Sequence, residues 1–412
     1  MSITFRKILI ICFVFCSINL LGQTASTPVG SGTSISPYLI SNLNELYWIQ
    51  NQNKTAATVY IELTNDIDAS ATSTWTNGWE PIGGTFQGSF DGKGYTISNL
   101  LIRNKYVTAT SGRFRAGLFA ATNGATIKDL ILTVKLDLIP NGQTSTHPHL
   151  NLYGALTGSA NLTTITDVRV TGEMINIDPA TVDYSNMLSI GGIAGSLSNS
   201  TLLRCSFEGT LIGRGNVAGT GTGGGNSMSE CYVDATMYIE YDNKIGKHGY
   251  SLPGMMGRNT SGSFLNCYTK GTIYGYYGIS GFSYPWGSTI TNCFAAVDIV
   301  IRKKTGASSF NYSPTAAFCW LFSWNHSATF TDCISDASLN KTGLNTYSTV
   351  LESAVTTWST YSAKNFNTSF WGINANINDG YPYLLNVLVP VSCITPTISG
   401  TTSLCVGAST TL

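Results

Sequence analysis

The sequence predicts an all-β fold, a right-handed parallel β-helix with a short N-terminal capping helix, on the strength of three observations. An apolar position recurs along the chain at intervals of roughly 26 to 40 residues, within the range of solenoid repeats. A polar residue, most often Asn or Asp, stands immediately before it. The segment that follows alternates apolar and polar residues, as a strand with one buried face does. Coils of this kind, stacked about 4.8 Å apart, make a parallel β-helix.

The recurring apolar position, which we call the anchor column, is predicted to line the interior. Its members are Leu100, Leu130, Val168, Cys205, Cys231, Cys267, Cys293 and Cys333. The residue three positions earlier is also apolar, and these residues are Ile97, Ile127, Ile165, Leu202, Met228, Phe264, Ile290 and Phe330. Four residues after the anchors the side chain is mostly small, and six residues after it is large, which suits an interdigitated core.

The residues just before the anchors form a polar column: Asn99, Asp129, Asp167, Arg204, Glu230, Asn266, Asn292 and Asp332. Asn and Asp tolerate the left-handed backbone conformation and hydrogen-bond to nearby main chain. We therefore expect this column to bend the chain between two strands in most coils.

Residues 84–102 also contain a predicted corner, Asp91-Gly92-Lys93-Gly94, between apolar positions on both sides. The stretch from Phe86 to Leu100 resembles the opening of bacterial surface proteins built from GLUG-type repeats. Three later segments resemble the Gly-hydrophobic-hydrophobic-Gly core of that repeat, namely 117–120, 191–195 and 254–257. The resemblance covers roughly residues 38–385 and implies a β-helix associated with adhesion and the cell surface, without known catalytic residues.

The first 23 residues read as a secretory signal peptide. Arg6-Lys7 precede an apolar run from Ile8 to Leu21, which is too short for the roughly 20 residues of a membrane span, and cleavage is expected near Gly22. No other stretch is apolar for long enough to cross a bilayer. We expect a secreted or cell-surface protein of a Gram-negative bacterium, with type IX secretion as a candidate export route.

A Ser/Thr/Gly/Pro-rich leader, residues 24–37, comes next. In residues 41–50 the apolar Leu43, Leu46 and Ile49 fall close to helical spacing, and Ser41 or Asn42 can cap the start. Such a helix would cover the open end of the first coil. The β-helix itself is expected to span residues 38–387.

Residues 388–412 are expected to form a linker and the start of a truncated Ig-like module. The stretch from Pro396 to Gly407 resembles the first strands of Ig-like modules in large secreted proteins, and it stops before a sandwich core could close. Further domains of the same polypeptide are therefore expected downstream.

Composition argues against several classes of partner. Only 11% of residues are charged and the net charge is zero, so neither nucleic acid nor an anionic membrane is an electrostatically favoured partner. Asp66 and Asp68 could share a calcium ion, yet six to eight oxygens are needed and a polar turn is the preferred interpretation. We expect no cofactor and no metal.

The inward-facing cysteines leave two alternatives. Neighbours such as Cys205 and Cys231, or Cys267 and Cys293, would stack one coil apart and could form disulfides in an exported protein. Free, buried thiols that fill a packing column are favoured. Zinc is disfavoured because no Cys-x-x-Cys occurs.

An aromatic cluster is the candidate ligand site: Tyr274, Tyr276, Tyr277, Tyr284 and Trp286. Projecting along one flank, these rings would stack against sugar rings, whereas packing under loops is the simpler alternative. Glycans or a host or cell surface are the expected partners.

These observations favour a non-catalytic secreted surface protein that serves as an adhesion or stalk module. The alternative is a polysaccharide-degrading β-helix enzyme, a lyase or a glycoside hydrolase. Such enzymes need clustered Asp with calcium and a basic residue, or paired carboxylates across a groove, and the sequence offers scattered acids without such a motif.

Overall fold

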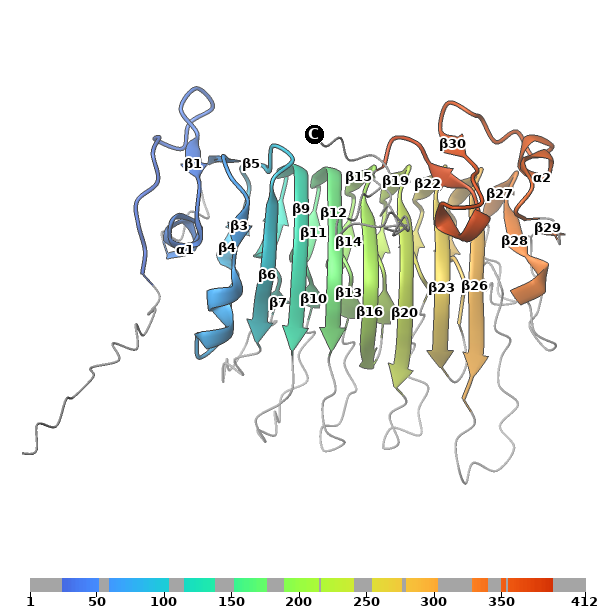
Figure 1. Ribbon diagram of the computed structural model, residues 1–412, viewed down its shortest axis with the longest axis horizontal. Coiled ribbons are helices and arrows are strands. Elements are labelled where there is room, and N and C mark those ends of the chain that lie inside the picture. Colours follow the sequence, from blue (N-terminus) through green and yellow to red (C-terminus); the bar gives the residue numbers. More distant parts are fainter. Residues whose placement is uncertain are drawn as a thin grey trace, which may run out of the picture.

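The computed structural model describes residues 24–51, 59–103, 115–137, 152–175, 189–214, 216–240, 254–275, 279–302, 328–339, 350–352 and 355–387. The described part is nearly all β and forms a right-handed parallel β-helix, as predicted. In Figure 1 the near strands β9, β12, β16 and β20 run downward while the chain advances to the right, and the return strands lie behind them. That is the right-handed sense, which parallel crossovers adopt almost without exception.

Most strands belong to one large parallel sheet, which bends where the polar column lies. Its strands are β1 (Tyr38–Ile40), β2 (Tyr60–Leu63), β3 (Ile67–Asp68), β5 (Ser89–Asp91), β6 (Thr96–Arg103), β9 (Thr126–Asp137), β12 (Thr164–Ile175), β15 (Thr201–Leu203), β16 (Ser206–Arg214), β19 (Ser227–Ser229), β20 (Tyr232–Glu240), β22 (Ser263–Leu265), β23 (Tyr268–Gly275), β25 (Thr289–Thr291), β26 (Phe294–Ile301), β27 (Thr329–Thr331), β28 (Ile334–Asp336) and β29 (Val350–Glu352).

Two smaller parallel sheets complete the coils. One consists of β4 (Ile82–Phe86), β8 (Phe119–Asn123), β11 (Thr157–Asn161), β14 (Ala194–Ser198), β18 (Thr222–Gly224), β21 (Gly257–Thr260) and β24 (Ser283–Trp286). The other consists of β7 (Arg115–Ala116), β10 (Leu152–Gly154), β13 (Ser189–Gly191) and β17 (Asn216–Ala218).

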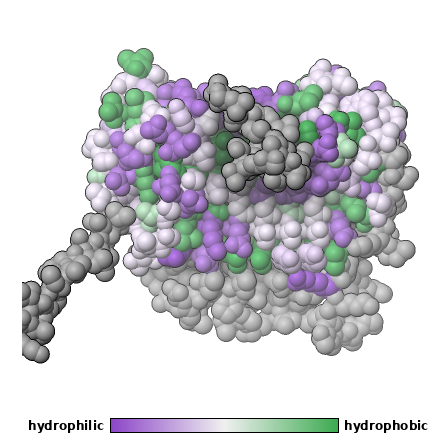
Figure 2. Space-filling view, in the orientation of Figure 1, coloured by the Kyte–Doolittle hydropathy of each residue, from purple (hydrophilic) through white to green (hydrophobic). Residues whose placement is uncertain are grey.

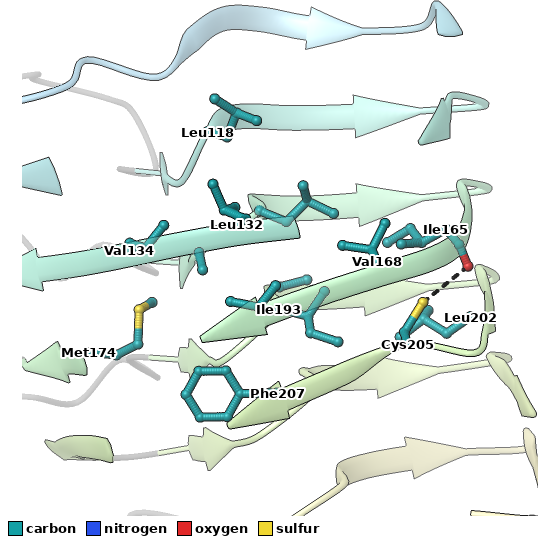
Figure 3. Packing of buried hydrophobic residues seen from close by; sticks show 14 of the residues in the cluster. Leu118, Leu132, Val134, Ile165, Val168, Met174, Ile193, Leu202, Cys205 and Phe207 are labelled. Carbon is teal, nitrogen blue, oxygen red and sulfur yellow. Dashed lines mark hydrogen bonds between the residues drawn. The ribbon is translucent and has the colours of Figure 1, made fainter. Parts of the chain in front are cut away.

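The anchor column lines the core, as predicted. Seven of its members have no exposed surface, and Cys333 is 6% exposed. From β9 onward the column three residues earlier stacks in register, beginning with Ile127 against Ile165 and Ile165 against Leu202. Figure 3 shows Val168, Ile193, Cys205 and Phe207 converging between the sheets. The solenoid interior is therefore continuous from coil to coil.

The first repeat departs from the predicted alignment. Leu100 pairs with Val134, not with Leu130, and Phe90 occupies the place opposite Ile127. The reason is that β9 stacks on two strands, β5 and β6, and the turn between them adds residues that the later coils lack. The left-handed residue of this corner is Lys93, whereas Asn99 lies in a bulge of β6.

The small column four residues after the anchors has a backbone reason as well as a packing reason. Gly209 adopts φ +144°, and a Cβ there would lie 1.9 Å from the carbonyl oxygen of Gly172 in the preceding coil. Coils thus approach more closely at this column than a side chain permits.

The predicted capping helix is present as α1 (Leu43–Asn51). The Asn42 side chain accepts a hydrogen bond from the Glu45 backbone N–H at 3.1 Å, and the Glu45 carboxylate accepts one from the Ser41 N–H at 2.7 Å, an exchange close to a capping box. Leu46 and Ile49 are fully buried in the core. The helix therefore covers the first coil.

Residues 355–387, here named the C-terminal segment, form no further coil, although the sequence placed the β-helix boundary at 387. The segment contains α2 (Trp358–Ser362), β30 (Trp371–Gly372), η3 (Asn378–Gly380) and β31 (Tyr383–Leu384), and the two strands pair only with each other. Figure 1 shows it folded back over the near sheet. Two other short helices, η1 (Ser70–Thr74) and η2 (Ala337–Leu339), lie within the solenoid.

Candidate functional site

The polar column is left-handed throughout. All eight residues have φ between 50° and 58°, including Arg204 and Glu230, whose side chains give no help with that conformation. Tertiary stacking therefore imposes the bend. The column then divides into two functional halves according to what its side chains contact.

In the later coils the polar column holds the C-terminal segment. Four of its members take part in these hydrogen bonds: Asn386 Nδ2 to Glu230 Oε2 at 3.0 Å, Trp371 Nε1 to Asn266 Oδ1 at 3.4 Å, Asn292 Nδ2 to the Asn365 carbonyl at 2.9 Å, and Asn365 Nδ2 to Asp332 Oδ2 at 2.8 Å. The side chains that the sequence assigned only to bending the chain thus also anchor the segment.

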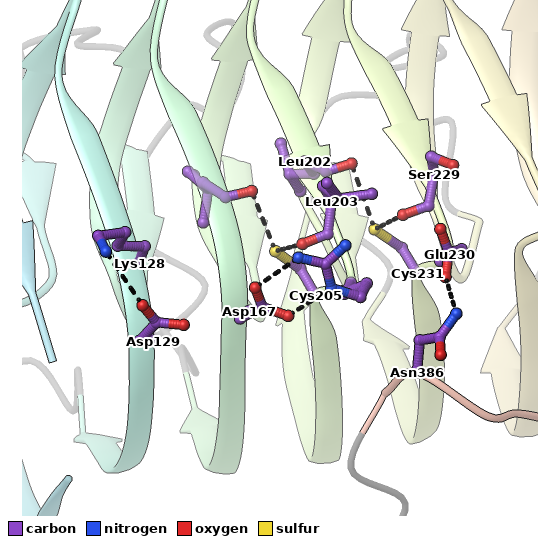
Figure 4. A network of polar contacts seen from close by, with 12 residues as sticks. Lys128, Asp129, Asp167, Leu202, Leu203, Cys205, Ser229, Glu230, Cys231 and Asn386 are labelled. Atoms are coloured by element: carbon purple, nitrogen blue, oxygen red, sulfur yellow. Dashed lines mark hydrogen bonds and ion pairs between the residues drawn. The ribbon is translucent and has the colours of Figure 1, made fainter. Parts of the chain in front are cut away.

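In the earlier coils the same column borders a groove of about 480 Å³. The groove lies between the outer face of the large sheet and the end of the C-terminal segment. Its lining residues are Lys93, Gly94, Asp129, Leu130, Ile131, Asp167, Arg169, Arg204, Asn386 and Val387. Figure 4 shows polar contacts around it, and Figure 2 shows hydrophilic and hydrophobic residues interspersed on the visible part of this face.

Ion pairs organise the rim of the groove. Arg204 donates two hydrogen bonds of 2.6 Å to the two oxygens of Asp167, and this contact raises the pKa of the Arg204 guanidinium. Lys93 and Lys128 both bind the Asp91 carboxylate, at 3.0 and 2.9 Å. These contacts fix the side chains before any ligand arrives.

Arg169 differs from the other cations of the groove. One terminal nitrogen pairs with Glu208 at 3.3 Å, while the buried Nε has no hydrogen-bond partner among the residues that the structure describes. Burial raises the pKa of Glu208, against the opposing effects of Tyr232 and Arg169. A buried guanidinium N–H without a partner is costly.

The predicted aromatic cluster is not one surface. Tyr274 lies on β23 of the large sheet, where its ring stacks on Tyr238 at 4.8 Å with Arg302 over both rings. Tyr284 and Trp286 lie on β24 of the seven-stranded sheet, the former 3% and the latter 47% exposed. Tyr276 and Tyr277 lie outside the described residues.

The acidic pair proposed for calcium has structural partners. Asp66 accepts a hydrogen bond from the Thr96 N–H, and Asp68 accepts bonds from the Ser70 N–H and Asn99 Nδ2. These bonds, led by that from Asn99, lower the pKa of Asp68. Over the described ranges no group of three or more His, Cys, Asp or Glu residues could hold a metal ion.

The five anchor cysteines are free and buried, in line with the favoured interpretation. Their thiols donate to main-chain carbonyls, as Cys205 does to Leu203 at 3.3 Å and to Ile165 at 3.4 Å. Burial raises the pKa of the Cys205 thiol well above its usual value. This column therefore serves packing rather than chemistry.

Sequence reasoning missed the groove. Arg204 gave one signal, because it is the only cation in a column of Asn and acidic residues. Arg169 and Asn386 gave no signal, because they are separated by more than two hundred positions and line the same groove only after folding. The signal peptide and the Ig-like module lie outside the described residues, and in the described part no helix is long and apolar enough to span a membrane.

Fold and groove together define a parallel β-helix with a polar groove on its outer face. No protein-family model matches the chain. A segment of the chain is 33% identical over 184 residues to halomucin of Haloquadratum walsbyi. The matched region covers 43% of this chain and 2% of halomucin. The chain thus matches only a small part of that relative.

Two solved structures are similar at low identity. One is a protein from Bacteroides ovatus described as a candidate immunoglobulin A1 protease, with a TM-score of 0.43, 16% identity, and coverage of 86% of this chain and 94% of that one. The other is described as an IgA1 protease, with a TM-score of 0.39, 14% identity, and coverage of 72% and 19%. Neither transfers an activity to this chain.

Proposed function

We propose that the chain is a non-catalytic, secreted surface module that binds an acidic saccharide in the groove and so acts in adhesion. The observation that carries the proposal is the buried, unpartnered Nε of Arg169 in a groove lined by three basic and two acidic side chains. Guanidinium groups prefer carboxylate or sulfate oxygens as partners.

The shape of the groove agrees with a sugar ring. Its volume of about 480 Å³ falls within the range of small-ligand sites. Ile131 and Val387 supply apolar contacts against which the carbon face of a ring can pack, and Asn386 supplies an amide near the rim. An acidic sugar would use both kinds of contact at once.

The surface location rests on two supports. The predicted signal peptide directs export, and the partial likeness to a protein named as a mucin supports an extracellular place. The resemblance to GLUG-type repeats is a third indication, and adhesion is the role that it implies.

The experiment is a titration of the full chain with uronic-acid oligosaccharides and with their neutral counterparts. We expect Arg169→Gln to weaken binding of the acidic series by about tenfold or more, the equivalent of one charge-assisted hydrogen bond. Lys135→Gln is the control, because Lys135 lies on the same face but its side chain is 56% exposed. If Arg169→Gln and the unchanged chain bound the acidic oligosaccharides with equal affinity, the proposal that the groove binds them would be contradicted.

The same oligosaccharides test the enzymatic alternative. New reducing ends or unsaturated uronic products after incubation with calcium would show a hydrolase or a lyase, and would contradict a non-catalytic role. The aromatic alternative is tested with Tyr276, Tyr277 and Trp286 changed to Ala, where unchanged glycan binding would remove those residues from the site.

A further inference from the structure

A narrow face of the solenoid is built from three-residue strands. β15, β19, β22, β25 and β27 lie as a row above the long strands, and Figure 1 shows most of their labels along that edge. A left-handed residue lies two positions before β15, β19, β22 and β25, as Asn199 does before β15, and the polar column follows each strand. Between two such corners each strand exposes its first and third residues and turns its middle residue toward the core.

The first exposed position carries a hydroxyl group in each described coil from β5 to β27. In register these residues are Ser89, Thr126, Thr164, Thr201, Ser227, Ser263, Thr289 and Thr329. Ser263 Oγ donates to Ser227 Oγ at 3.2 Å, which shows how closely neighbouring coils align these groups.

In six successive coils the third position of the strand is also uncharged and forms a second row, or rank, beside the first. We name this surface the hydroxyl ribbon. It consists of Thr164, Thr166, Thr201, Leu203, Ser227, Ser229, Ser263, Leu265, Thr289, Thr291, Thr329 and Thr331. All the members except two leucines bear hydroxyl groups, and none bears a charge. The adjoining outer face of the large sheet, by contrast, is crossed by ion pairs.

The hydroxyl ribbon faces solvent. The first-rank side chains of Thr164, Thr201, Ser227, Thr289 and Thr329 are exposed, and Leu265 is 43% exposed. The C-terminal segment reaches the polar column at the border of the ribbon and packs on the other side of it, against Tyr232, Tyr268 and Phe294. The two ranks therefore remain accessible along their described length.

The ribbon is a regular lattice. Neighbouring coils are about 4.8 Å apart, and the two ranks are about 6.6 Å apart along each strand. Its strand pairs run residue for residue without a register shift. The oxygen atoms of ice repeat at comparable spacings in two directions, so hydroxyl groups on such a lattice can occupy positions of ice water molecules.

We propose that the hydroxyl ribbon is an ice-binding face. Threonine offers a hydroxyl that joins the water lattice and a methyl that excludes other water, whereas a charged group would hold its own hydration shell. The absence of charge from the ribbon and the unbroken register together favour an ordered water lattice over a charged polymer. The proposal is independent of the groove, which lies beyond the polar column on the neighbouring face.

The test measures how much of the full chain is taken up from cold solution into a slowly growing ice surface, together with inhibition of ice recrystallisation. We expect the unchanged chain to enter the ice and to keep recrystallised grains small. Thr201→Lys and Ser227→Lys should lose both properties, because each places a hydrated charge in the middle of the ribbon.

Two controls separate the lattice from general effects. Ser227→Thr keeps the hydroxyl and should keep ice uptake, and Thr236→Lys adds the same charge on the outer face of β20 and should also keep it. Thermal melting followed by circular dichroism checks that each variant is folded. Exclusion of the unchanged chain from ice overturns the proposal. An equal loss of ice uptake in Thr236→Lys also overturns it. Binding of the chain to insoluble chitin or cellulose without uptake into ice, or dimerisation through the ribbon without uptake into ice, would do the same.

Discussion

The outer face of the large sheet is one continuous backbone surface, but its earlier coils are left uncovered by the C-terminal segment and its later coils are covered by it. In its earlier coils the outward-facing row one residue after the anchors reads Ile131, Arg169 and Ser206, and it borders a groove edged by ion pairs. In its later coils the same row becomes Tyr232, Tyr268, Phe294 and Ile334. These side chains are at most 1% exposed because the C-terminal segment covers them.

The difference shows that side-chain content decides which part of a uniform sheet is covered. The Tyr232 and Tyr268 rings are parallel at 4.8 Å, and Tyr268 and Phe294 at 5.1 Å. Left open, this ladder would be an exposed apolar patch, which soluble proteins rarely tolerate. The charged half is stable in water and stays available for a ligand.

The largest effect should come from removing the main anchor of the C-terminal segment. Trp371 is 1% exposed and its ring lies 5.7 Å from that of Phe294. We expect Trp371→Ala to destabilise the segment by about 3–5 kcal/mol, the range for large buried aromatics. Hydrogen exchange should show loss of protection in residues 355–387 while the earlier coils stay protected.

The control is Trp286→Ala, because Trp286 is 47% exposed and lies on a different sheet. This variant should change the hydrogen-exchange protection of residues 355–387 little. Equal loss of protection in the coils around β9 and in the segment would mean that the two halves are not separate in energy, and the comparison would fail.

A smaller effect should distinguish the two halves of the polar column. Asn292→Gly keeps the left-handed backbone but loses the bond to the Asn365 carbonyl, which should cost about 0.5–1.5 kcal/mol and loosen the segment. Asp129→Gly loses only an exposed ion pair with Lys128 at 3.3 Å, worth about 0–1 kcal/mol. Faster proteolysis within 355–387 in the first variant alone would support the division; the same rate in both would contradict it.

The smallest effect concerns the loss of stability in acid. It arises in the earlier coils that the C-terminal segment leaves uncovered, which we call the open half. Burial alone would raise the pKa of Asp91, but hydrogen bonds from Lys128 and Lys93 outweigh burial and lower it. A lowered pKa gives stability that is present above the unfolded value, roughly 3.9, and is lost as the pH falls through the folded value.

Denaturant unfolding between neutral pH and strong acid should therefore show a shallower acid loss in Asp91→Asn than in the unchanged chain. The difference should stay within about 1 kcal/mol, since both lysines are partly exposed. An identical pH profile would show that these ion pairs contribute nothing to the open half.

Local pattern predicted much of the fold. The apolar column, the left-handed Asn and Asp positions and the capping helix follow from periodicity and from side chains that act on their own backbone. The first repeat was misaligned because a turn and a bulge, which have no fixed apolar signature, shift the register of β6. Spacing along the chain could not reveal that Tyr274 and Tyr284, which are close in sequence, belong to different sheets.

The sequence by itself determined that this chain coils, which side chains face inward, and where each coil bends, because those properties repeat within a few residues of one another. Only the tertiary structure decided that residues 355–387 turn back over an aromatic ladder, that Arg169 and Asn386 line one groove, and that twelve side chains align as one ribbon. These arrangements depend on the register between coils and on contacts across more than a hundred residues, and no local pattern encodes either.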